Sequence, residues 1–466
     1  MITAIALDLG STSIKACLLD QHGILSNIVS QAAPPVHADG ERYESDALAY
    51  AKIADQVLAD CLAHTDFLPP LGMCSQRSSF VIWEKNTGKP VTPLISWQDT
   101  RGAESCIALQ AQEPHITELT GLRLTPYYFA TKLRVVLQQN PLWRELLIQG
   151  ELLVGTLDTF LIWRWTSGKQ HVTDVSMAAR TLLMDIRQQQ WSPVLCDLFD
   201  IPLGILPAIQ PSTALNVKLK SGLILQASLG DQSAALLASV GEDRDVALVN
   251  LGTGGFVIRY LAEDFTDTNG YLRTLVYQDN TKKTHIAIEG TLNSIAAALA
   301  PYPVAKCTVD EMALNDIFCV AEPSGIGAPY FRKDIGLQFS LSVGHLSKKE
   351  IACLMLEAII FRVVRIVEEF NHSTPIKHVY LSGGLSELNS LQQGIAQCML
   401  CDVYRLQQRD ASLQGAGMLA AGIKQQKNQQ IEKIQLDTIN PALMEKYQRW
   451  KIWLVGLLGI DVPVAP

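Results

Sequence analysis

Apolar runs that end in glycine and small hydroxyl residues open both halves of the chain. Runs of this length, bounded by Gly, Ser and Thr, predict buried strands joined by a tight turn. The strand, turn and strand lie at 2–7, 8–12 and 14–19 in the first half, and at 246–249, 250–254 and 256–260 in the second. Each half is therefore expected to begin with a strand–turn–strand hairpin.

Strand patterns and helix patterns alternate along the rest of the chain. Helical spacing of apolar residues predicts helices at 46–63, 232–240 and 346–371. Short β-type runs predict strands at 24–29, 71–75, 79–84, 91–97, 284–289 and 378–381. This alternation is typical of layered α/β domains, in which helices cover a sheet.

The length of the chain predicts more than one domain. A chain of 466 residues is too long for one compact core, so two large domains are expected. We place them at 1–240 and 245–466, with the short segment 241–244 as a hinge. Each domain then carries one of the two hairpins.

Composition narrows the classes of function. Apolar residues make up 48% and charged residues 18% of the chain, as in ordinary globular proteins. A net charge of −8 without runs of Lys or Arg argues against nucleic acid, whose binding needs clustered cations. No apolar stretch is long enough to span a membrane, and ten scattered cysteines are typical of reduced thiols. We expect a cytoplasmic protein that binds neither nucleic acid nor membranes.

The two turns are the first candidate site. Glycine lets backbone N–H groups and hydroxyls converge on an anion without hindrance from a Cβ atom. One such turn is weak evidence, since ordinary hairpins use the same residues. Because the turn is repeated in each half, we expect two lobes that hold one polyphosphate from opposite sides.

Nine segments, in order along the chain, resemble the FGGY family of carbohydrate kinases in the actin/hexokinase/Hsp70-like ATPase superfamily. The segments are DLGSTSIKA (8–16), SQRSSFVIWEKNTGKPVTPLISWQDTR (75–101), TPYYFATK (125–132), GTLDTFLIWRWTSGKQHVTDVSMAARTLL (155–183), LGDQSAAL (229–236), LGTGGF (251–256), GIGAPY (325–330), SGGLSELNSLQ (382–392) and SLQGAGMLAAG (412–422). The similarity points to the glycerol-kinase-like branch and extends from Ile5 to about Ile423.

The resemblance implies a fold and a reaction. The fold would be α/β, with two actin/hexokinase-like (ribonuclease H-like) domains and a central interdomain cleft. The reaction would be transfer of the γ-phosphoryl group of ATP to a hydroxyl of a small polyol or sugar. The N-terminal domain would bind the acceptor and the phosphates, and the C-terminal domain would bind the nucleotide.

The resemblance also implies how ATP and Mg²⁺ would be held. Asp8 would position Mg²⁺ through water, since Mg²⁺ dehydrates reluctantly. Lys15 stands where relatives usually have Arg; it keeps the charge but loses the bidentate geometry. The implied contacts are Ser11, Thr12, Ser13, Lys15, Thr253 and Gly254 for the phosphates, and Gly383, Gly384, Ala416 and Gly417 for the adenine.

The acceptor site is implied in the same way. Asp231 would be the general base that takes the proton from the attacking hydroxyl. An aspartate before an Ala-rich helix is also a good N-cap, and both roles stay open. The residues implied for the acceptor are Gln76, Arg77, Ser78, Trp97, Tyr127, Asp231 and Gln232. Core packing is an alternative for Trp97 and Tyr127, and Asp99 is expected to form a structural ion pair with Arg101.

Besides Lys15, three positions depart from the glycerol-kinase pattern. Ser78 replaces a Glu that would join Arg77 in holding two hydroxyls, so a larger polyol or a sugar becomes an alternative to glycerol. Leu388 replaces an amide that commonly meets adenine, and Ala300 replaces a Gln. Recognition of the base is then expected to rest on backbone and shape.

Several functions stay open from the sequence. The acceptor is alternatively a ketopentose of the xylulose or ribulose type, or a sugar acid. A non-catalytic nucleotide-binding regulator is an alternative of another class, and the retained Asp231 argues against it. A chaperone-like or filament-forming ATPase would have no use for the implied hydroxyl-binding residues. The assembly is also open, with a homodimer as one expectation.

Overall fold

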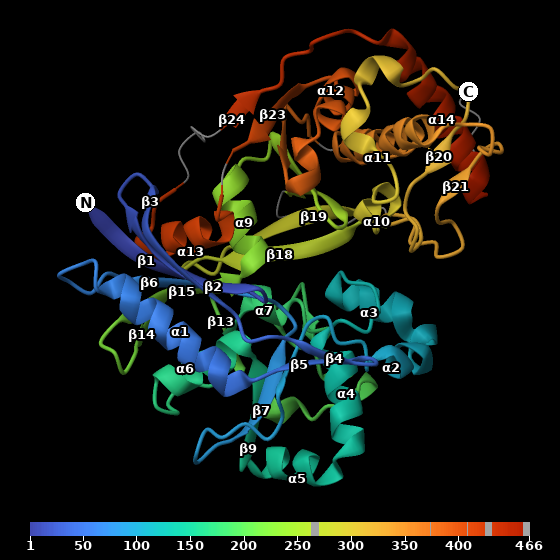
Figure 1. The fold of residues 1–466 in the computed structure, drawn as a ribbon. Coiled ribbons are helices and arrows are strands. Elements are labelled where there is room, and N and C mark those ends of the chain that lie inside the picture. The colour runs from blue at the N-terminus through green and yellow to red at the C-terminus, as the bar shows by residue number, and fades with distance from the viewer. Residues whose placement is uncertain (262–269, 373, 408, 425–430, 460–466) are drawn as a thin grey trace. The chain divides into compact units, whose positions relative to one another are not determined.

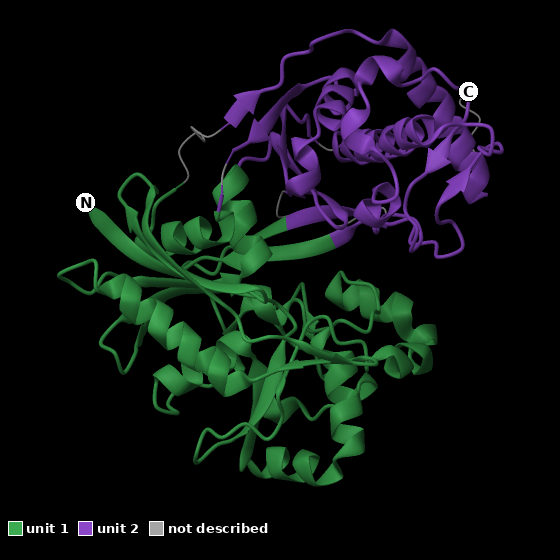
Figure 2. Cartoon of the chain, in the orientation of Figure 1, with its two compact units in different colours: residues 1–241, 273–286, 410–426 green, residues 242–272, 287–409, 427–466 purple. Residues whose placement is uncertain are grey.

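The chain folds into two compact units (Figures 1 and 2). The computed structural model describes residues 1–261, 270–372, 374–407, 409–424 and 431–459. The first unit contains 1–241, 273–286 and 410–426, and the second contains 242–272, 287–409 and 427–466. The chain therefore returns twice to the first unit after the predicted hinge. Residues 410–426, which the sequence groups with the second half, pack in the first unit.

The first unit is built on a six-stranded sheet that starts with the predicted hairpin. The sheet order is β14 (Thr213–Lys218), β15 (Ile224–Gly230), β6 (Leu71–Ser75), β1 (Ile2–Leu9), β2 (Ser13–Asp20) and β3 (Leu25–Ala32). β1 runs antiparallel to β2 and parallel to β6, and β6 runs parallel to β15. The carboxyl ends of β15, β6 and β1 therefore lie side by side.

Alternation along β1 directs its side chains to two helical layers. Ile5 and Leu7 are buried in the core that includes α1, whereas Ala6 packs with Leu413 of α13 on the other face. Asp8 has the same parity as Ala6 and so faces α13. The helices of this unit are α1 (Ala47–Leu62), α2 (Ala103–Ala108), α3 (Glu113–Thr120), α4 (Phe129–Gln139), α5 (Pro141–Gln149), α6 (Leu157–Trp165), α7 (Val175–Ala178), α8 (Pro193–Leu198), α9 (Asp231–Val240) and α13 (Ala411–Ala421).

A second, five-stranded sheet of the first unit supports the segment around residue 97. Its order is β4 (His37–Asp39), β5 (Arg42–Ser45), β8 (Leu94–Ile95), β7 (Phe80–Glu84) and β9 (Leu152–Thr156). Helix α4 covers this sheet, and the rings of Phe80 and Phe129 meet edge to face with centroids 5.0 Å apart. The strand predicted at 91–97 is shorter than expected, because the chain turns away after Ile95. Four short strands, β10 (Val172–Asp174), β11 (Met184–Asp185), β12 (Gln190–Trp191) and β13 (Ala208–Gln210), complete the unit.

The second unit repeats the hairpin at the centre of its own sheet. Its strands follow the order β19 (Thr284–Leu292), β17 (Gly255–Tyr260), β16 (Val246–Leu251), β22 (His378–Ser382), β23 (Asp402–Leu406) and β24 (Ile431–Lys433). Most of β18 (Leu272–Gln278) and the first residues of β19 count with the first unit. The remaining strands and α-helices are β20 (Cys319–Val320), β21 (Gln338–Phe339), α10 (Ile295–Leu299), α11 (Lys348–Phe370), α12 (Asn389–Cys398) and α14 (Pro441–Leu458).

The predicted α/β class and the main helices are confirmed. Local signals locate them: Asp46 caps α1 by accepting from two backbone N–H groups, and Ser347 forms a capping box with Glu350 at the start of α11. In the described residues, no helix has both the length and the apolar character needed to cross a membrane.

Candidate active site

Three turns of the first unit meet at one edge of its main sheet. Leu9 of β1, Ser75 of β6 and Gly230 of β15 are in register. The residues that follow these strands are Ser11–Ser13, Gln76–Ser78 and Asp231, respectively. The parallel topology thus brings phosphate, acceptor and base candidates to the same place.

Asp231 is the first residue of α9 rather than its N-cap. The N-cap is Gly230, and no side chain caps this helix; Oδ1 of Asp231 instead accepts from the N–H of Gln232 at 2.7 Å. The N-cap alternative from the sequence is therefore wrong. The helix start is fixed by a buried chain in which the Gly230 N–H donates to Ser176 Oγ at 2.9 Å, and Ser176 Oγ donates to Asp174 at 3.0 Å.

The carboxylate of Asp231 lies beside two arginines. Nε of Arg77 is 3.7 Å from Oδ1, and the side chain of Asp231 is 33% exposed. The Arg77 guanidinium also donates to the side-chain carbonyl of Gln232. Burial raises the pKa of Asp231, while Arg77 and Arg180 act in the opposite direction. The carboxylate is one-third exposed, and a general base must be accessible in this way. Arg180 was not predicted from the sequence.

Asp8 and Lys15 face each other across the first hairpin. Oδ2 of Asp8 accepts from Ser412 Oγ at 2.6 Å, and Nζ of Lys15 pairs with Asp410 at 2.6 Å. Burial raises the pKa of Asp8 to about 6; the Ser412 hydroxyl opposes this rise and the charge of Asp231 adds to it. The start of α13 thus completes the charged part of this turn. Sequence reasoning missed Asp410 and Ser412, because no local pattern links them to β1.

The turn at 10–13 has a backbone shape that requires glycine. A Cβ atom on Gly10 would lie 2.8 Å from the carbonyl oxygen of Ser13. The Tyr50 hydroxyl donates to the Gly10 carbonyl at 2.7 Å. The N–H of Ala33 donates to the carbonyl of Thr12 at 3.0 Å. The side chain of Thr12 is exposed, so its hydroxyl is accessible to a ligand.

Gln76 and Ser78 are buried, and both use their side chains within the protein. Oε1 of Gln76 accepts from Ser79 Oγ at 2.9 Å, and Ser78 Oγ donates to the carbonyl of Arg180 at 2.9 Å. Ser78 also has φ +65°, a left-handed conformation that is unusual for a residue with a side chain. These two residues shape the turn around Arg77.

Trp97 and Tyr127 are surface residues. Their exposed fractions are 41% and 48%, so the core-packing alternative is wrong for both. The N–H of Trp97 donates to Ser79 Oγ at 2.8 Å, which joins it to the Gln76–Ser79 turn. Tyr127 lies just before α4.

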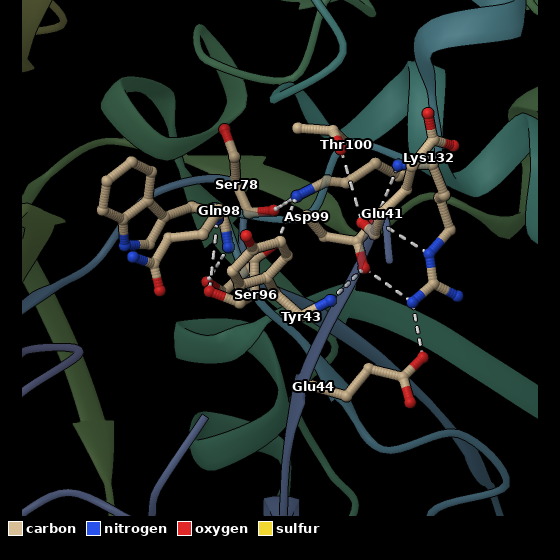
Figure 3. Close-up of polar contacts among 12 residues, drawn as sticks. Glu41, Tyr43, Glu44, Ser78, Ser96, Gln98, Asp99, Thr100 and Lys132 are labelled. Atoms are coloured by element: carbon tan, nitrogen blue, oxygen red, sulfur yellow. Dashed lines mark hydrogen bonds and ion pairs between the residues drawn. The ribbon is translucent and has the colours of Figure 1, made fainter. Parts of the chain in front are cut away.

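The predicted ion pair of Asp99 and Arg101 is confirmed (Figure 3). Asp99 is fully buried and accepts from Arg101 Nε at 2.8 Å and from the N–H of Tyr43 at 2.8 Å. Arg101 also pairs with Glu44. This cluster anchors the segment after Trp97 to β5.

The turn of the second unit is built from backbone. The N–H of Gly252 donates to the carbonyl of Gly254 at 2.8 Å. Gly383 has φ +88°, and a Cβ on it would lie 2.4 Å from the carbonyl oxygen of Leu251. Thr253, Gly383 and Gly384 are exposed. Because β16 and β22 are parallel neighbours, the structure brings the predicted residues 253–254 and 383–384 together.

Ala416 and Gly417 lie in the first unit and are buried in α13. A Cβ on Gly72 of β6 would lie 2.0 Å from the carbonyl oxygen of Ala416, and one on Gly417 would lie 2.9 Å from Leu19 Cδ1. These small residues let the helix lie directly on the sheet. Leu388 is half-buried as the N-cap of α12, and Ala300 is exposed at the end of α10.

Comparisons with known proteins agree along nearly the whole chain. The N-terminal domain model of the FGGY family of carbohydrate kinases matches residues 3–249, and the C-terminal domain model matches residues 246–422. Glycerol kinase of Shewanella sp. (strain W3-18-1) is 30% identical over 447 residues, which cover 89% of each chain. The structure of Plasmodium falciparum glycerol kinase with ADP has a TM-score of 0.84 at 21% identity and covers 99% of each chain. A xylulose kinase from Lactobacillus acidophilus has a TM-score of 0.77 at 18% identity, over 98% of each chain. The two structures confirm the predicted fold class.

Proposed function

Because this chain belongs to the FGGY family of carbohydrate kinases, we propose that its acceptor is a small polyol. The chain is an ATP-dependent carbohydrate kinase, a phosphotransferase with an alcohol group as acceptor. The name of the 30% identical relative, glycerol kinase, supports a polyol rather than a larger sugar.

The observation that carries the proposal is the contact of Arg77 with Asp231 and Gln232 at the start of α9. In the proposed reaction, the acceptor oxygen bonds to the γ-phosphorus of ATP while its proton passes to the carboxylate of Asp231. The bond between that phosphorus and the β–γ bridging oxygen breaks, and ADP leaves. Arg77 donates to acceptor hydroxyls and keeps the carboxylate ionised. Trp97 and Tyr127 offer exposed aromatic faces to the carbon chain.

Each glycine-rich turn is proposed as a phosphate-binding element. Hydroxyls and N–H groups of Ser11, Thr12 and Ser13, and of Thr253 and Gly254, would hold the phosphates. Lys15 would share its charge between a phosphate and Asp410.

The adenine is proposed to lie against exposed glycine backbone. Gly383 and Gly384 would face it directly. Ala416 and Gly417 are buried, so they would act through the position of α13.

The residues around Asp8 fit Mg²⁺. One carboxylate oxygen of Asp8 accepts from Ser412, and a carboxylate has further lone pairs with which it would hold a hydrated cation. In the described part of the chain, no cluster of three or more His, Cys, Asp or Glu forms a protein cage for a metal. Mg²⁺ is usually held by one or two carboxylates together with substrate phosphates, and Asp8 suits that role. When bound, the ion would neutralise charge on the transferring phosphoryl group.

A panel of acceptors tests the proposal. ADP release is measured with glycerol, four- to six-carbon polyols, ketopentoses and sugar acids, against ADP release with water alone. We expect a polyol to raise ADP release at least about tenfold, and Asp231→Asn to abolish that rise, as expected for a general base. Phosphorylation of none of these compounds would refute the proposed acceptor class.

A second candidate is a ketopentose or a sugar acid. It is favoured by Ser78, whose hydroxyl donates to the carbonyl of Arg180. Serine also has no carboxylate that could accept from two adjacent hydroxyls of glycerol. The same panel separates the two.

Location and assembly are further proposals. The ten cysteines are free thiols, which supports a reducing compartment such as the cytoplasm. A homodimer is tested by light scattering.

A further inference from the structure

Lys132, in the first turn of α4, is fully buried. A buried ammonium or amine must find acceptors inside the protein. Nζ of Lys132 donates to the carbonyl oxygen of Ser78 and to that of Ser96, each at 2.8 Å (Figure 3). Within the described residues, no carboxylate forms an ion pair with Lys132. The neighbouring carboxylate, Asp99, pairs with Arg101. Burial lowers the pKa of Lys132 to about 7, and Asp99 opposes this shift.

The two carbonyls belong to the two segments that carry the proposed acceptor residues. Ser78 follows Arg77 directly, and Ser96 precedes Trp97 directly. A lysine from α4 therefore joins the turn after β6 to the segment after β8. Because Lys132 is fully buried, it does so without contact with solvent.

The turn at Ser78 needs such support. Its left-handed conformation persists only where the surroundings determine it. The carbonyl of Ser78 accepts from Lys132, and its hydroxyl donates to Arg180. Both polar ends of the residue are thus fixed, and so is the direction in which the neighbouring Arg77 leaves the backbone.

A second tie joins the same two segments. Ser79 Oγ accepts from the N–H of Trp97 at 2.8 Å and donates to Gln76 at 2.9 Å. On the far side, Asp99 and Arg101 anchor the Trp97 segment to β5. These bonds hold the backbone of the two segments, while Trp97 as a residue stays 41% exposed.

We propose that Lys132 is a positioning residue for the acceptor, whose Nζ sets the spacing between Arg77 and Trp97 by holding the carbonyls of Ser78 and Ser96. The proposal rests on the acceptor site proposed above. It assigns a role in acceptor selection to a side chain that touches neither substrate nor nucleotide.

The test is Lys132→Met, which keeps the length of the side chain and removes both donors. We expect the KM for the best acceptor to rise about 10- to 100-fold, since small misplacements of binding groups have effects of this size. The KM for ATP should change less than about threefold. The preference among polyols of different length, as a ratio of kcat/KM values, should narrow. Lys132→Arg keeps donors and should recover part of the acceptor affinity.

The matched control is the buried Lys446 of the second unit, which pairs with Glu357 at 2.5 Å. Lys446→Met combined with Glu357→Gln removes a buried lysine without leaving an unpaired carboxylate. It should change thermal stability and leave the acceptor KM unchanged. Equal effects of the two replacements on the acceptor KM would overturn the proposal.

If Lys132→Met does not fold, Ser79→Ala tests the same positioning role. It removes only the second tie and should raise the acceptor KM about 3- to 10-fold at constant ATP KM. A rise in ATP KM as large as that in acceptor KM, in either variant, would contradict the positioning role. Wild-type enzyme that phosphorylates no compound of the acceptor panel would refute the proposed function itself, before any variant is measured.

Discussion

The two glycine-rich turns share a sequence pattern and differ in what surrounds them. In the first unit, Asp8 and Lys15 are engaged by Ser412 and Asp410, so charges hold the turn. In the second unit, the backbone of Gly383 lies close to the carbonyl of Leu251, and the turn is formed by backbone atoms. The pattern thus predicts the shape of the hairpin but not its chemistry. The charged residues proposed for phosphoryl transfer, Asp8, Lys15 and Asp231, all belong to the first unit.

Replacing the proposed base should have the largest effect. Asp231→Asn should lower kcat by about 10²–10⁴, the usual contribution of a general base, because an amide cannot take up the proton. Thermal stability and the KM for ATP should stay nearly unchanged. Since Gly230 is the N-cap, Asp231→Ala should also retain stability. Steady-state kinetics measure kcat and KM, and thermal unfolding measures stability, for both variants. Asp200→Asn, a substitution of an exposed aspartate, is the control. A near wild-type rate for Asp231→Asn would place the chemistry elsewhere.

Two neighbouring glycines test the backbone-built turn of the second unit. Gly383→Ala forces a side chain into φ +88° and against Leu251, so it should destabilise the protein by about 2 kcal/mol or more and weaken ATP binding. Gly384→Ala meets open space and should change stability by less than about 0.5 kcal/mol. Denaturant unfolding and nucleotide titration provide the data. Equal effects of the two substitutions would show that the close approach of Gly383 is unimportant.

The buried lysine of the first unit predicts a pH-dependent stability. The pKa of Lys132 is about 7 in the folded protein, against 10.5 when unfolded. Between these values the unfolded chain binds more protons, so stability contributed by this group rises with pH, by on the order of 1 kcal/mol per pH unit. Hydrogen bonds with Asp99 and Glu44 outweigh burial and raise the pKa of Arg101, so its charge does not change over this range. The Tm of wild type minus that of Lys132→Met should therefore increase from pH 7 to pH 9. A constant difference would mean that the lysine keeps an ordinary pKa.

Breaking the ion pair of Lys15 and Asp410 should have a smaller effect on the charged turn of the first unit. Lys15→Met should raise the KM for ATP about 3- to 10-fold, because one partly exposed charge is lost near the phosphates. Asp410→Asn frees Lys15 and should leave the KM for ATP equal or lower. Kinetics at low and high salt measure the difference, which salt should reduce. A higher KM in both variants would mean that the pair acts as a structural unit.

The smallest effect is expected at the acceptor. Ser78→Glu introduces a strong acceptor of hydrogen bonds beside Arg77, and should shift the kcat/KM ratio toward glycerol a few-fold. The gain is limited because the hydroxyl bond to Arg180 is lost. The ratio for glycerol against longer polyols is the measurement, and an unchanged ratio would refute this role of position 78.

Elements with a local signal could be predicted from the sequence, and partners without one could not. Periodicity and capping residues place α1 and α11, and the turn pattern places both hairpins. Nothing near Lys132 or Ser412 in the sequence shows which carbonyl or carboxylate each will meet, because tertiary packing decides this. For the same reason, the sequence does not predict whether Trp97 is buried or exposed. The position of Asp231 relative to the cap depended on one residue, which is finer than pattern reasoning resolves.

The return of α13 to the first unit has a consequence for how the protein is made. During synthesis, β1 and β2 leave the ribosome early, but the helix that covers Ala6 and supplies Ser412 emerges only after residues 242–409. Until then, one face of the main sheet is uncovered, and the nascent chain is vulnerable to aggregation. A fragment that ends at Gly241 would keep this vulnerability permanently, whereas adding residues 410–426 as a separate peptide should restore its solubility.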